Sequence, residues 1–182
     1  RGDVYPKDLW GNAFITDSPT NLVHRLVITN DGLGPMKAKN GYAQGEFLAS
    51  SDERFRPVAL FDGPDGNMYV VDMYRGVVQA GGIWSAYLTD YIKSHDLELP
   101  VGRGRIWRVV YGNAPRPAAP ALSRATPAQL AQTLSNPKGW WRDTAQRLLV
   151  ERGDKSVVPT LKTLAGGAPD WRTRLHALWT LD

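Results

Sequence analysis

The chain has 182 residues, of which 42% are hydrophobic and 22% are charged, a composition typical of a folded globular protein rather than a disordered one. Its formal net charge is only +4, and it lacks the basic stripe by which proteins bind nucleic acids. It has no cysteine, which excludes disulfides, thiolate metal sites and a catalytic thiol, and no segment approaches the ~20 apolar residues that span a membrane. We therefore expect neither a nucleic-acid partner nor a transmembrane span in these residues.

The first part of the sequence, residues 1–112, has the two-residue period of β-strands. Residues 12–17 and 22–29 are predicted strands, and the segment that joins them, Ser18-Pro-Thr-Asn21, has a turn composition. A glycine-rich segment then leads to a short outer strand at residues 46–50. The pattern predicts an antiparallel sheet in the first half of this part.

The clearest strand pattern follows in the second half. Two apolar runs at residues 57–63 and 68–73 are joined by Pro64-Asp-Gly66, whose glycine can adopt the positive φ that reverses the chain. A third apolar strand is predicted at residues 103–111, after a long insertion with a short helix at residues 85–94. Three antiparallel strands with this turn chemistry make up most of a β-propeller blade. Residues 1–112 are thus predicted to be about two C-terminal blades of a partial propeller.

After this part the hydrophobic period changes from two to 3.6 residues. The proline-rich segment at residues 113–122 is predicted to be an extended linker. Residues 123–182 follow, with predicted helices at residues 126–134, 140–152, 157–165 and 170–181. The pair Trp141-Arg142 recurs as Trp171-Arg172, a spacing of about 30 residues that indicates HEAT-like α-solenoid repeats. We expect Trp140, Trp141 and Trp171 to lie in the core of these repeats. The predicted fold class is therefore β plus α.

The two ends of the sequence indicate further segments. The chain begins without methionine and ends within a helical pattern, so we expect missing parts of the same polypeptide, or partner subunits, to complete it. The strand at residues 103–111 has no candidate fourth strand after it, because proline cannot donate to a sheet ladder. Its outer edge is expected to pair with a segment from elsewhere.

Several strings resemble one bacterial family, the membrane-bound dehydrogenases abundant in planctomycete- and verrucomicrobium-like bacteria. The strings include Glu46-Phe-Leu-Ala-Ser-Ser-Asp-Glu-Arg-Phe-Arg-Pro57, Val70-Val-Asp-Met-Tyr-Arg75, Gly104-Arg-Ile-Trp-Arg108 and Gly139-Trp-Trp-Arg-Asp-Thr-Ala-Gln-Arg-Leu-Leu149. Members of that family combine a propeller similar to quinoprotein sugar dehydrogenases, a HEAT-repeat region and often a c-type haem domain. The resemblance covers nearly the whole chain.

The resemblance implies a fragment of an exported, quinoprotein-like oxidoreductase in the periplasm or associated with the cell envelope. Such a protein would oxidise a sugar or another alcohol with pyrroloquinoline quinone (PQQ) and calcium, and would pass electrons to a c-type cytochrome. The haem-attachment motif Cys-x-x-Cys-His does not occur here, so any haem lies outside this chain.

A candidate cofactor site follows from the order of strands in a blade. Arg56 enters the innermost strand, and Asp72, Tyr74 and Arg75 leave the next strand at the same face, beneath the long insertion. Arginine forks bind carboxylates bidentately and aromatic rings stack, so these four residues are candidate contacts for PQQ, which carries three carboxylates. The alternative is that Arg56 and Arg75 form ion pairs with Asp72 and Asp52 that tie neighbouring blades together.

No catalytic residue is evident, although His95 in the insertion is a candidate general base, because neutral imidazole accepts a hydroxyl proton. A solvated loop histidine is the alternative. His24 is interpreted as a packing or hydrogen-bonding residue and His176 as a structural residue of a helix. Asp62 and Asp65 could bind calcium, but they also suit a turn, and we predict no metal ligands in this chain.

The sequence leaves a second function open. Propellers and solenoids are both common binding scaffolds that need no cofactor. The chain could therefore belong to a non-catalytic interaction subunit of a larger assembly. A c-type haem motif and a catalytic histidine elsewhere in the polypeptide would favour the enzyme.

Overall fold

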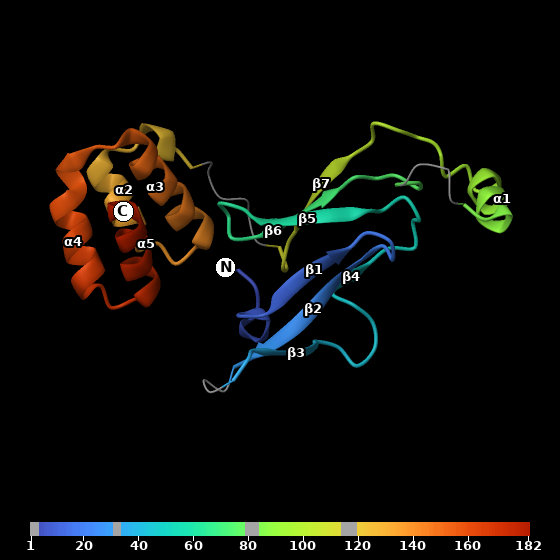
Figure 1. The fold of residues 1–182 in the computed structure, drawn as a ribbon, viewed down its shortest axis with the longest axis horizontal. Helices are drawn as coiled ribbons and strands as arrows, with labels where there is room; N and C mark the ends of the chain where they lie inside the picture. The colour runs from blue at the N-terminus through green and yellow to red at the C-terminus, as the bar shows by residue number, and fades with distance from the viewer. Residues whose placement is uncertain (1–3, 31–33, 79–83, 114–119) are drawn as a thin grey trace. The chain divides into compact units, whose positions relative to one another are not determined.

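The computed structural model describes residues 4–30, 34–78, 84–113 and 120–182. The chain divides into two compact units. The first, here called the sheet unit, comprises Pro6–Phe61 and Met68–Val109, and the second, the helical unit, includes Asp62–Asn67 and Val110–Asp182. The fold is thus mixed β and α, with two antiparallel sheets and a group of helices (Figure 1).

The first sheet is built around β2 (Leu22–Thr29). On one side β2 pairs with β1 (Ala13–Asp17), and on the other with both β3 (Lys37–Asn40) and β4 (Leu48–Ala49). The predicted strands before and after the first turn are confirmed. Strand β3 was not predicted, because all four of its residues are exposed and it therefore has no apolar alternation.

The second sheet has the order β5–β6–β7, with strands Pro57–Asp62, Met68–Asp72 and Arg105–Val109. All three were predicted, although β7 is shorter than residues 103–111. The helix α1 (Ala86–Ser94) lies in the connection between β6 and β7, as predicted. It begins where the Ser85 side chain accepts a hydrogen bond from Leu88 N at 3.2 Å, a normal N-cap.

The core of the sheet unit contains residues from both sheets. Val23 of β2 and Val70 of β6 are completely buried, and Phe55 is nearly so. Five partly buried residues pack around them: Phe14, Phe47, Leu48, Leu60 and Val109. Each fully buried aliphatic side chain stabilises the fold by about 1.5–3 kcal/mol. This apolar cluster therefore holds the two sheets face to face within the sheet unit.

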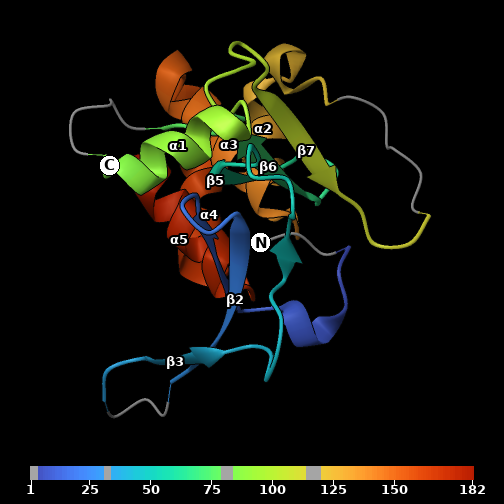
Figure 2. The same cartoon turned by 90° about the vertical axis from the view of Figure 1, so that its right-hand side faces the viewer.

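The helical unit contains α2 (Pro127–Thr133), α3 (Gly139–Arg152), α4 (Val158–Gly167) and α5 (Trp171–Leu181), which pack side by side (Figures 1 and 2). All four helices were predicted, and a capping box at Thr126 and Gln129 fixes the first of them. Their core includes the fully buried Leu130, Leu134, Ala145 and Ala177. None of the helices among the described residues is long and apolar enough to span a membrane.

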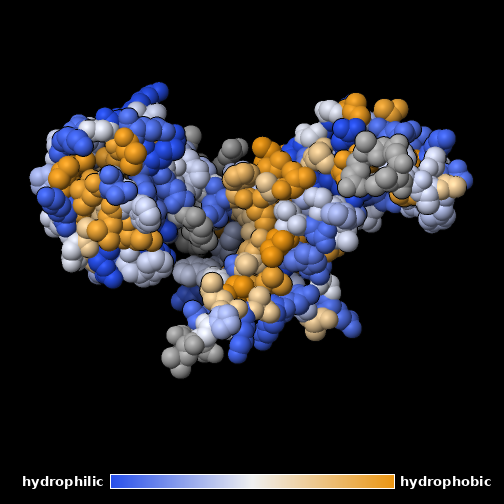
Figure 3. All heavy atoms as spheres, in the orientation of Figure 1, coloured by the Kyte–Doolittle hydropathy of each residue, from blue (hydrophilic) through white to orange (hydrophobic). Residues whose placement is uncertain are grey.

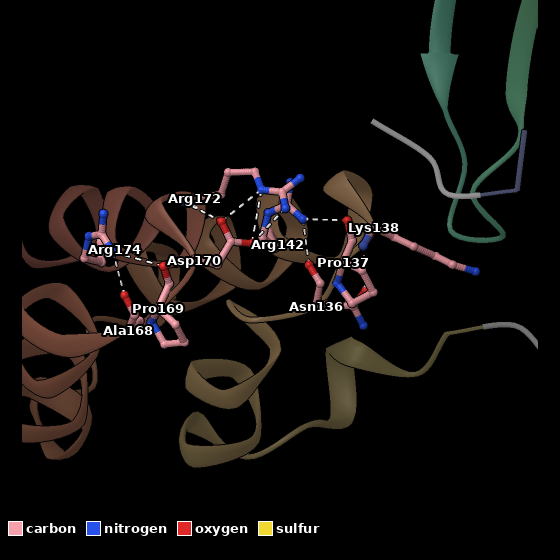
Figure 4. Close-up of polar contacts among 9 residues, drawn as sticks. All are labelled: Asn136, Pro137, Lys138, Arg142, Ala168, Pro169, Asp170, Arg172 and Arg174. Carbon is pink, nitrogen blue, oxygen red and sulfur yellow. Dashed lines mark hydrogen bonds and ion pairs between the residues drawn. The ribbon is translucent and has the colours of Figure 1, made fainter. Parts of the chain in front are cut away.

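Two of the helices share an arginine contact at their start, and the residues that make it are not the pair that the predicted repeat matched. Arg142 Nη1 donates to the carbonyl oxygens of Asn136 and Pro137, just before α3, at 2.6 and 2.8 Å. Arg174 Nη1 makes the same two contacts, with Ala168 and Pro169, at 2.7 and 3.2 Å (Figure 4). The residue equivalent to Arg142 is therefore Arg174, and not Arg172 as the tryptophan–arginine pairs predicted.

The two tryptophans used to set the predicted register are accordingly not equivalent. Trp141 is partly buried, packs against Trp140 and donates to Pro64 O at 2.7 Å within the helical unit. Trp171 is 62% exposed, so the prediction that it lies in the core is wrong. It is the first residue of α5 and directly follows the N-cap Asp170.

Candidate functional site

The four predicted cofactor contacts come together at one rim of the sheet unit. The backbone amide of Arg56 donates to Asp72 Oδ1 at 2.9 Å, and the amide of Tyr74 donates to the same oxygen at 2.8 Å. Arg56 Nε donates to the carbonyl oxygen of Arg75 at 3.0 Å. The rim is thus formed by the segment before β5 and the segment after β6.

The guanidinium of Arg56 fastens this rim to the first sheet. Its Nη1 donates to the carbonyl oxygens of Ser18 and Pro19, in the β1–β2 turn, at 2.8 and 3.0 Å. Its Nη2 donates to Gly76 O at 2.8 Å. Burial lowers the pKa of Arg56 from its usual value. These donors bind backbone, so Arg56 acts as a structural clamp.

This arrangement corrects one part of the predicted ion-pair alternative. Arg56 does tie neighbouring strands together, but its guanidinium binds carbonyl oxygens instead of the carboxylates of Asp72 and Asp52. Asp52 is exposed and accepts the backbone amide of Arg54 at 3.0 Å. Arg75 is exposed, and its contact with Arg56 is made by its carbonyl oxygen.

Asp72 is the centre of the rim. Its side chain is completely buried, and Oδ1 accepts two backbone amides. Oδ2 accepts the indole Nε1–H of Trp107 at 2.9 Å and lies 3.9 Å from Arg105 Nε. A buried carboxylate costs little only when it is paired and hydrogen-bonded in this way. Asp72 therefore positions the residues around it, and both of its oxygens are already engaged.

The more accessible part of the rim is formed by Tyr74, Arg105 and Trp107. The guanidinium carbon of Arg105 lies 3.6 Å from the centroid of the Tyr74 ring and 5.5 Å from that of Trp107. Both distances are within the range of cation–π attraction. Tyr74 has a φ of +49°, which is uncommon for an aromatic residue and costs of order 1–3 kcal/mol.

Sequence reasoning missed Arg105 and Trp107. In the β6–β7 pair Asp72 lies opposite Arg105, and Val70 lies opposite Trp107. Arg105 and Trp107 of β7 therefore lie on the same face of the sheet as Asp72 of β6. The alternation in Arg105-Ile-Trp107 was a signal for this, but only the register of two strands separated by the long insertion reveals the partners.

The insertion is attached to the sheet unit beside this rim. Arg54 donates to the carbonyl oxygens of His95, Asp96 and Leu99, at and beyond the end of α1, at distances of 2.9 to 3.1 Å. Tyr91 Oη donates to Glu53 Oε1 at 2.5 Å, and this hydrogen bond raises the pKa of the Tyr91 phenol. Two consecutive residues before β5 thus hold α1.

His95, the candidate general base, is the exposed C-cap residue of α1. Its ring stacks on Tyr91 at 4.0 Å, and Nδ1 lies 2.9 Å from Tyr91 O and 3.1 Å from Ser94 Oγ. The described contacts of the ring are thus all within its own helix. If Nδ1 carries the proton, it can donate to Tyr91 O, and Nε2 is then free to accept a proton. No described contact of the ring tests the catalytic role, which stays a prediction.

The other two histidines link elements of the fold. His24 Nε2 lies 3.3 Å from Asp17 Oδ2, and Nδ1 lies 2.9 Å from Glu46 Oε2. Hydrogen bonds to these carboxylates raise the pKa of His24. His176 Nδ1 lies 2.6 Å from Gln146 Oε1, which joins α5 to α3. Both observations agree with the interpretation of these histidines as structural.

The predicted calcium alternative lies at the opposite end of the β5–β6 hairpin. Asp65 is nearly buried, and its Oδ1 accepts the amide of Asn67 at 3.1 Å, while Gly66 has a φ of +84°. This is the turn geometry that the sequence favoured. In the part of the chain that the structure describes, no group of three His, Cys, Asp or Glu residues could hold a metal ion.

Comparison with known proteins gives a match to the sheet-rich part of the chain. Residues 1–113 match the model of a family whose description is "Domain of unknown function (DUF7133)". No curated protein and no solved structure matches the chain. The matched region ends before α2 and contains every residue of the rim.

Proposed function

We propose that this chain, which belongs to the DUF7133 family, is part of an exported quinoprotein-like oxidoreductase whose ligand site lies at the rim around Arg105. The proposed architecture is a partial β-propeller followed by HEAT-like repeats. The proposed reaction is the oxidation of a sugar or another alcohol with PQQ, with electrons passing to a c-type cytochrome. A periplasmic or cell-envelope location goes with this proposal and rests on the sequence resemblance.

The propeller part is supported by the faces of the two sheets. Their inner faces pack on each other, but Ile15, Phe61 and Ile106, on the opposite faces, are 47 to 67% exposed. Figure 3 shows hydrophobic residues gathered over the strands. A sheet that is apolar on both faces needs a further layer on each side, which neighbouring blades provide in a propeller. The repeated contacts of Arg142 and Arg174 support the HEAT-like part in the same way.

The residues of the rim fit the cofactor only in part. Arg75 and Arg105 could bind carboxylates, and Tyr74 or Trp107 could contact a planar ring. Arg56 and Asp72, which were predicted as contacts, are engaged within the protein and would support the site from below. Calcium finds no suitable group among the described residues, so its ligands would have to come from other parts of the polypeptide.

The observation that carries the proposal is the stack of Tyr74 and Arg105 beside the partly exposed Trp107. PQQ, when bound, would accept the hydride from the alcohol carbon. The protein would hold its carboxylates with Arg75 and Arg105 and exclude water from one ring face. His95 Nε2 remains the candidate acceptor of the alcohol proton, because the Nδ1 side faces its own helix.

The test is reconstitution of the full-length protein with PQQ, with and without calcium. We expect a perturbed quinone absorbance and reduction of an artificial electron acceptor with at least one member of a sugar and alcohol panel. Arg75→Gln should weaken PQQ binding about tenfold, whereas Arg124→Gln in the helical unit should not. An unchanged PQQ spectrum across all conditions would reject the cofactor.

A second function, a non-catalytic interaction subunit, is supported by the exposed side of α5. Trp171, Leu175, Leu178 and Trp179 are 43 to 62% exposed and recur at helical spacing. An apolar helix stripe of this kind is suited to packing against another helix. If the full-length protein binds no PQQ, but Trp179→Ser abolishes its association with a purified partner, the interaction function is favoured.

A further inference from the structure

The exposed side of α5 has the same order of side chains in both directions. Trp171, Leu175 and Trp179 follow one another at a spacing of four residues, so they lie along one side of the helix with the leucine at its centre. They are 62, 43 and 60% exposed, and Leu178 beside them is 55% exposed. A side with a tryptophan at each end and a leucine between them is complementary to an antiparallel copy of itself.

This apolar side does not repeat the contact that α3 makes with α5. Because Arg142 corresponds to Arg174, three residues of the apolar side, Leu175, Leu178 and Trp179, correspond to polar residues of α3, namely Asp143, Gln146 and Arg147. Gln146 Oε1 lies 2.6 Å from His176 Nδ1, so α3 meets α5 through polar atoms at these positions. A further helix stacked on α5 in the same way would not require the apolar residues.

A pocket lies at the C-terminal end of the same helix. It has a volume of about 350 Å³ and is bounded by the ends of α3 and α5 and by the start of α4. Its lining includes the buried Leu149, Val157 and Leu161, and also the exposed Trp179. Pockets that hold small ligands measure roughly 300–1,000 Å³, so this one is large enough for a single indole ring.

The tryptophan at one end of α5 and the pocket at the other end are related through Leu175. A helix rises 1.5 Å per residue, so Trp171 and Trp179 each lie about 6 Å along the axis from Leu175. A two-fold axis near Leu175 therefore places Trp171 of each copy beside Trp179 and the pocket of the other copy. Both contacts form at once, and paired aromatic rings attract each other beyond the area that they bury.

The charges at the two ends of α5 favour the same antiparallel arrangement. At its N-terminal end the N-cap and first turn have two arginines and one aspartate: Asp170, Arg172 and Arg174. The lining of the pocket at the C-terminal end has two aspartates and one lysine: Asp154, Lys155 and Asp182. The ends thus carry opposite net charge, and antiparallel packing brings unlike ends together, whereas parallel packing brings like ends together.

We propose that the protein forms a two-fold symmetric dimer through α5, in which Trp171 of each copy enters the pocket beside Trp179 of the other. The inference is independent of the quinoprotein function, and for the second candidate function it names the partner, a second copy of this chain. A tryptophan buries at most about 250 Å², so the apolar side offers less than the roughly 800 Å² per partner of a standard interface. We therefore expect a dissociation constant in the micromolar range.

The experiment is sedimentation velocity of the full-length protein at increasing micromolar concentrations, which should show a shift from monomer to dimer. Trp171→Ser and Trp179→Ser should each raise the dissociation constant at least tenfold, because in a symmetric dimer each substitution changes both contacts. The matched control is Tyr87→Ser, which removes a 77% exposed aromatic ring from α1 and should leave the dissociation constant unchanged. Circular dichroism checks the folding of each variant.

Cross-linking keeps the proposal falsifiable if the tryptophan variants unfold. These 182 residues contain no cysteine, so Leu175→Cys adds a thiol at the expected two-fold axis. A short bismaleimide should join two copies through residue 175, as identified by mass spectrometry. Leu88→Cys, at a leucine of α1 with a similar exposure of 40%, should not cross-link.

The outcomes separate the dimer from both candidate functions. A protein that stays monomeric, as when a further helix of the polypeptide covers α5, or a dimer that neither tryptophan variant weakens, would overturn the inference. A monomer that binds a different purified protein through Trp179 would also overturn it, but would keep the second candidate function. A Trp171-dependent dimer that binds no PQQ would keep the inference and reject the quinoprotein function.

Discussion

In the helical unit Arg142 and Arg174 donate from their guanidinium groups to carbonyl oxygens of the chain, whereas the side chain of Arg105, at the rim of the sheet unit, is 37% exposed and its terminal nitrogens have no acceptor among the described residues. The first pair is held by backbone and recurs with the helices. Arg105 is held by ring stacking and by the buried Asp72, which leaves its donors available. The comparison shows that arginines which are alike in sequence differ in whether the fold brings carbonyl acceptors near their terminal nitrogens, and we propose that Arg105, which has none among the described residues, is the ligand-binding one.

The largest effect is expected from removing the residue that keeps Arg105 in place. Asp72→Ala leaves two amides, an indole N–H and a guanidinium without their acceptor, and breaking such a buried network costs about 3–5 kcal/mol. Urea unfolding measures the change. The matched control is Asp90→Ala on the exposed surface of α1, which should change the free energy of unfolding by less than about 0.5 kcal/mol. A similar loss for both variants would show that Asp72 has no special role.

The next effect compares the two structural arginines with each other. Arg142 is 4% exposed, so Arg142→Met removes at least two hydrogen bonds from a buried position and should lower the free energy of unfolding by about 2–3 kcal/mol. Arg174 is only partly buried, and Arg174→Met should cost about 1 kcal/mol. If the order is reversed, burial does not determine the strength of this repeated contact.

A smaller effect on stability is expected from His24, whose ring contacts carboxylates, whereas the structural arginines bind carbonyl oxygens. Its pKa is raised in the folded protein by Asp17 and Glu46, so its contribution to stability is complete below the unfolded value of 6.5. That contribution is lost as the pH rises through the raised folded pKa. The free energy of unfolding should therefore fall as the pH rises from 6.5 through the raised folded pKa of His24, and His24→Gln should remove this fall. A pH profile that His24→Gln leaves unchanged would contradict the pairing.

The smallest effect is expected at an exposed ion pair of the helical unit. Arg147 Nη1 lies 2.9 Å from Glu151 Oε1, one turn further along α3, and both side chains are more than half exposed. Such pairs contribute about 0.3–0.5 kcal/mol. Arg147→Ala should therefore be nearly neutral in thermal unfolding, and a cost above about 1 kcal/mol would show that exposed arginines here are also structural clamps.

The elements could be predicted because their signals are local. Ser85 and Thr126 cap helices that follow directly, and Gly66 lies in the turn whose composition reverses the chain. Strand β3 was missed because exposed residues leave no apolar pattern. The predicted spacing was wrong because it aligned Trp141 with Trp171 by residue type. In the structure the buried Ala145 of α3 corresponds instead to the buried Ala177 of α5.

The site was harder to predict than the elements. The sequence placed Arg56 and Asp72 at one rim correctly, since both flank strands that the turn signals define. The sequence could not show that the donors of Arg56 are used within the protein. Their acceptors are carbonyl oxygens, and every residue carries one. Arg105 escaped notice because its partners are set by strand register and by the unusual φ of Tyr74.

The most direct test of the account compares Arg56→Gln with Arg105→Gln in the same two measurements. Arg56→Gln should lower the free energy of unfolding by about 2–3 kcal/mol and change the affinity of the folded protein for PQQ less than threefold. Arg105→Gln should weaken that affinity at least tenfold and lower the free energy of unfolding by less than about 1 kcal/mol. The opposite result, a stable Arg56→Gln that no longer binds and an Arg105→Gln that binds normally, would contradict the division between a structural and a ligand-binding arginine.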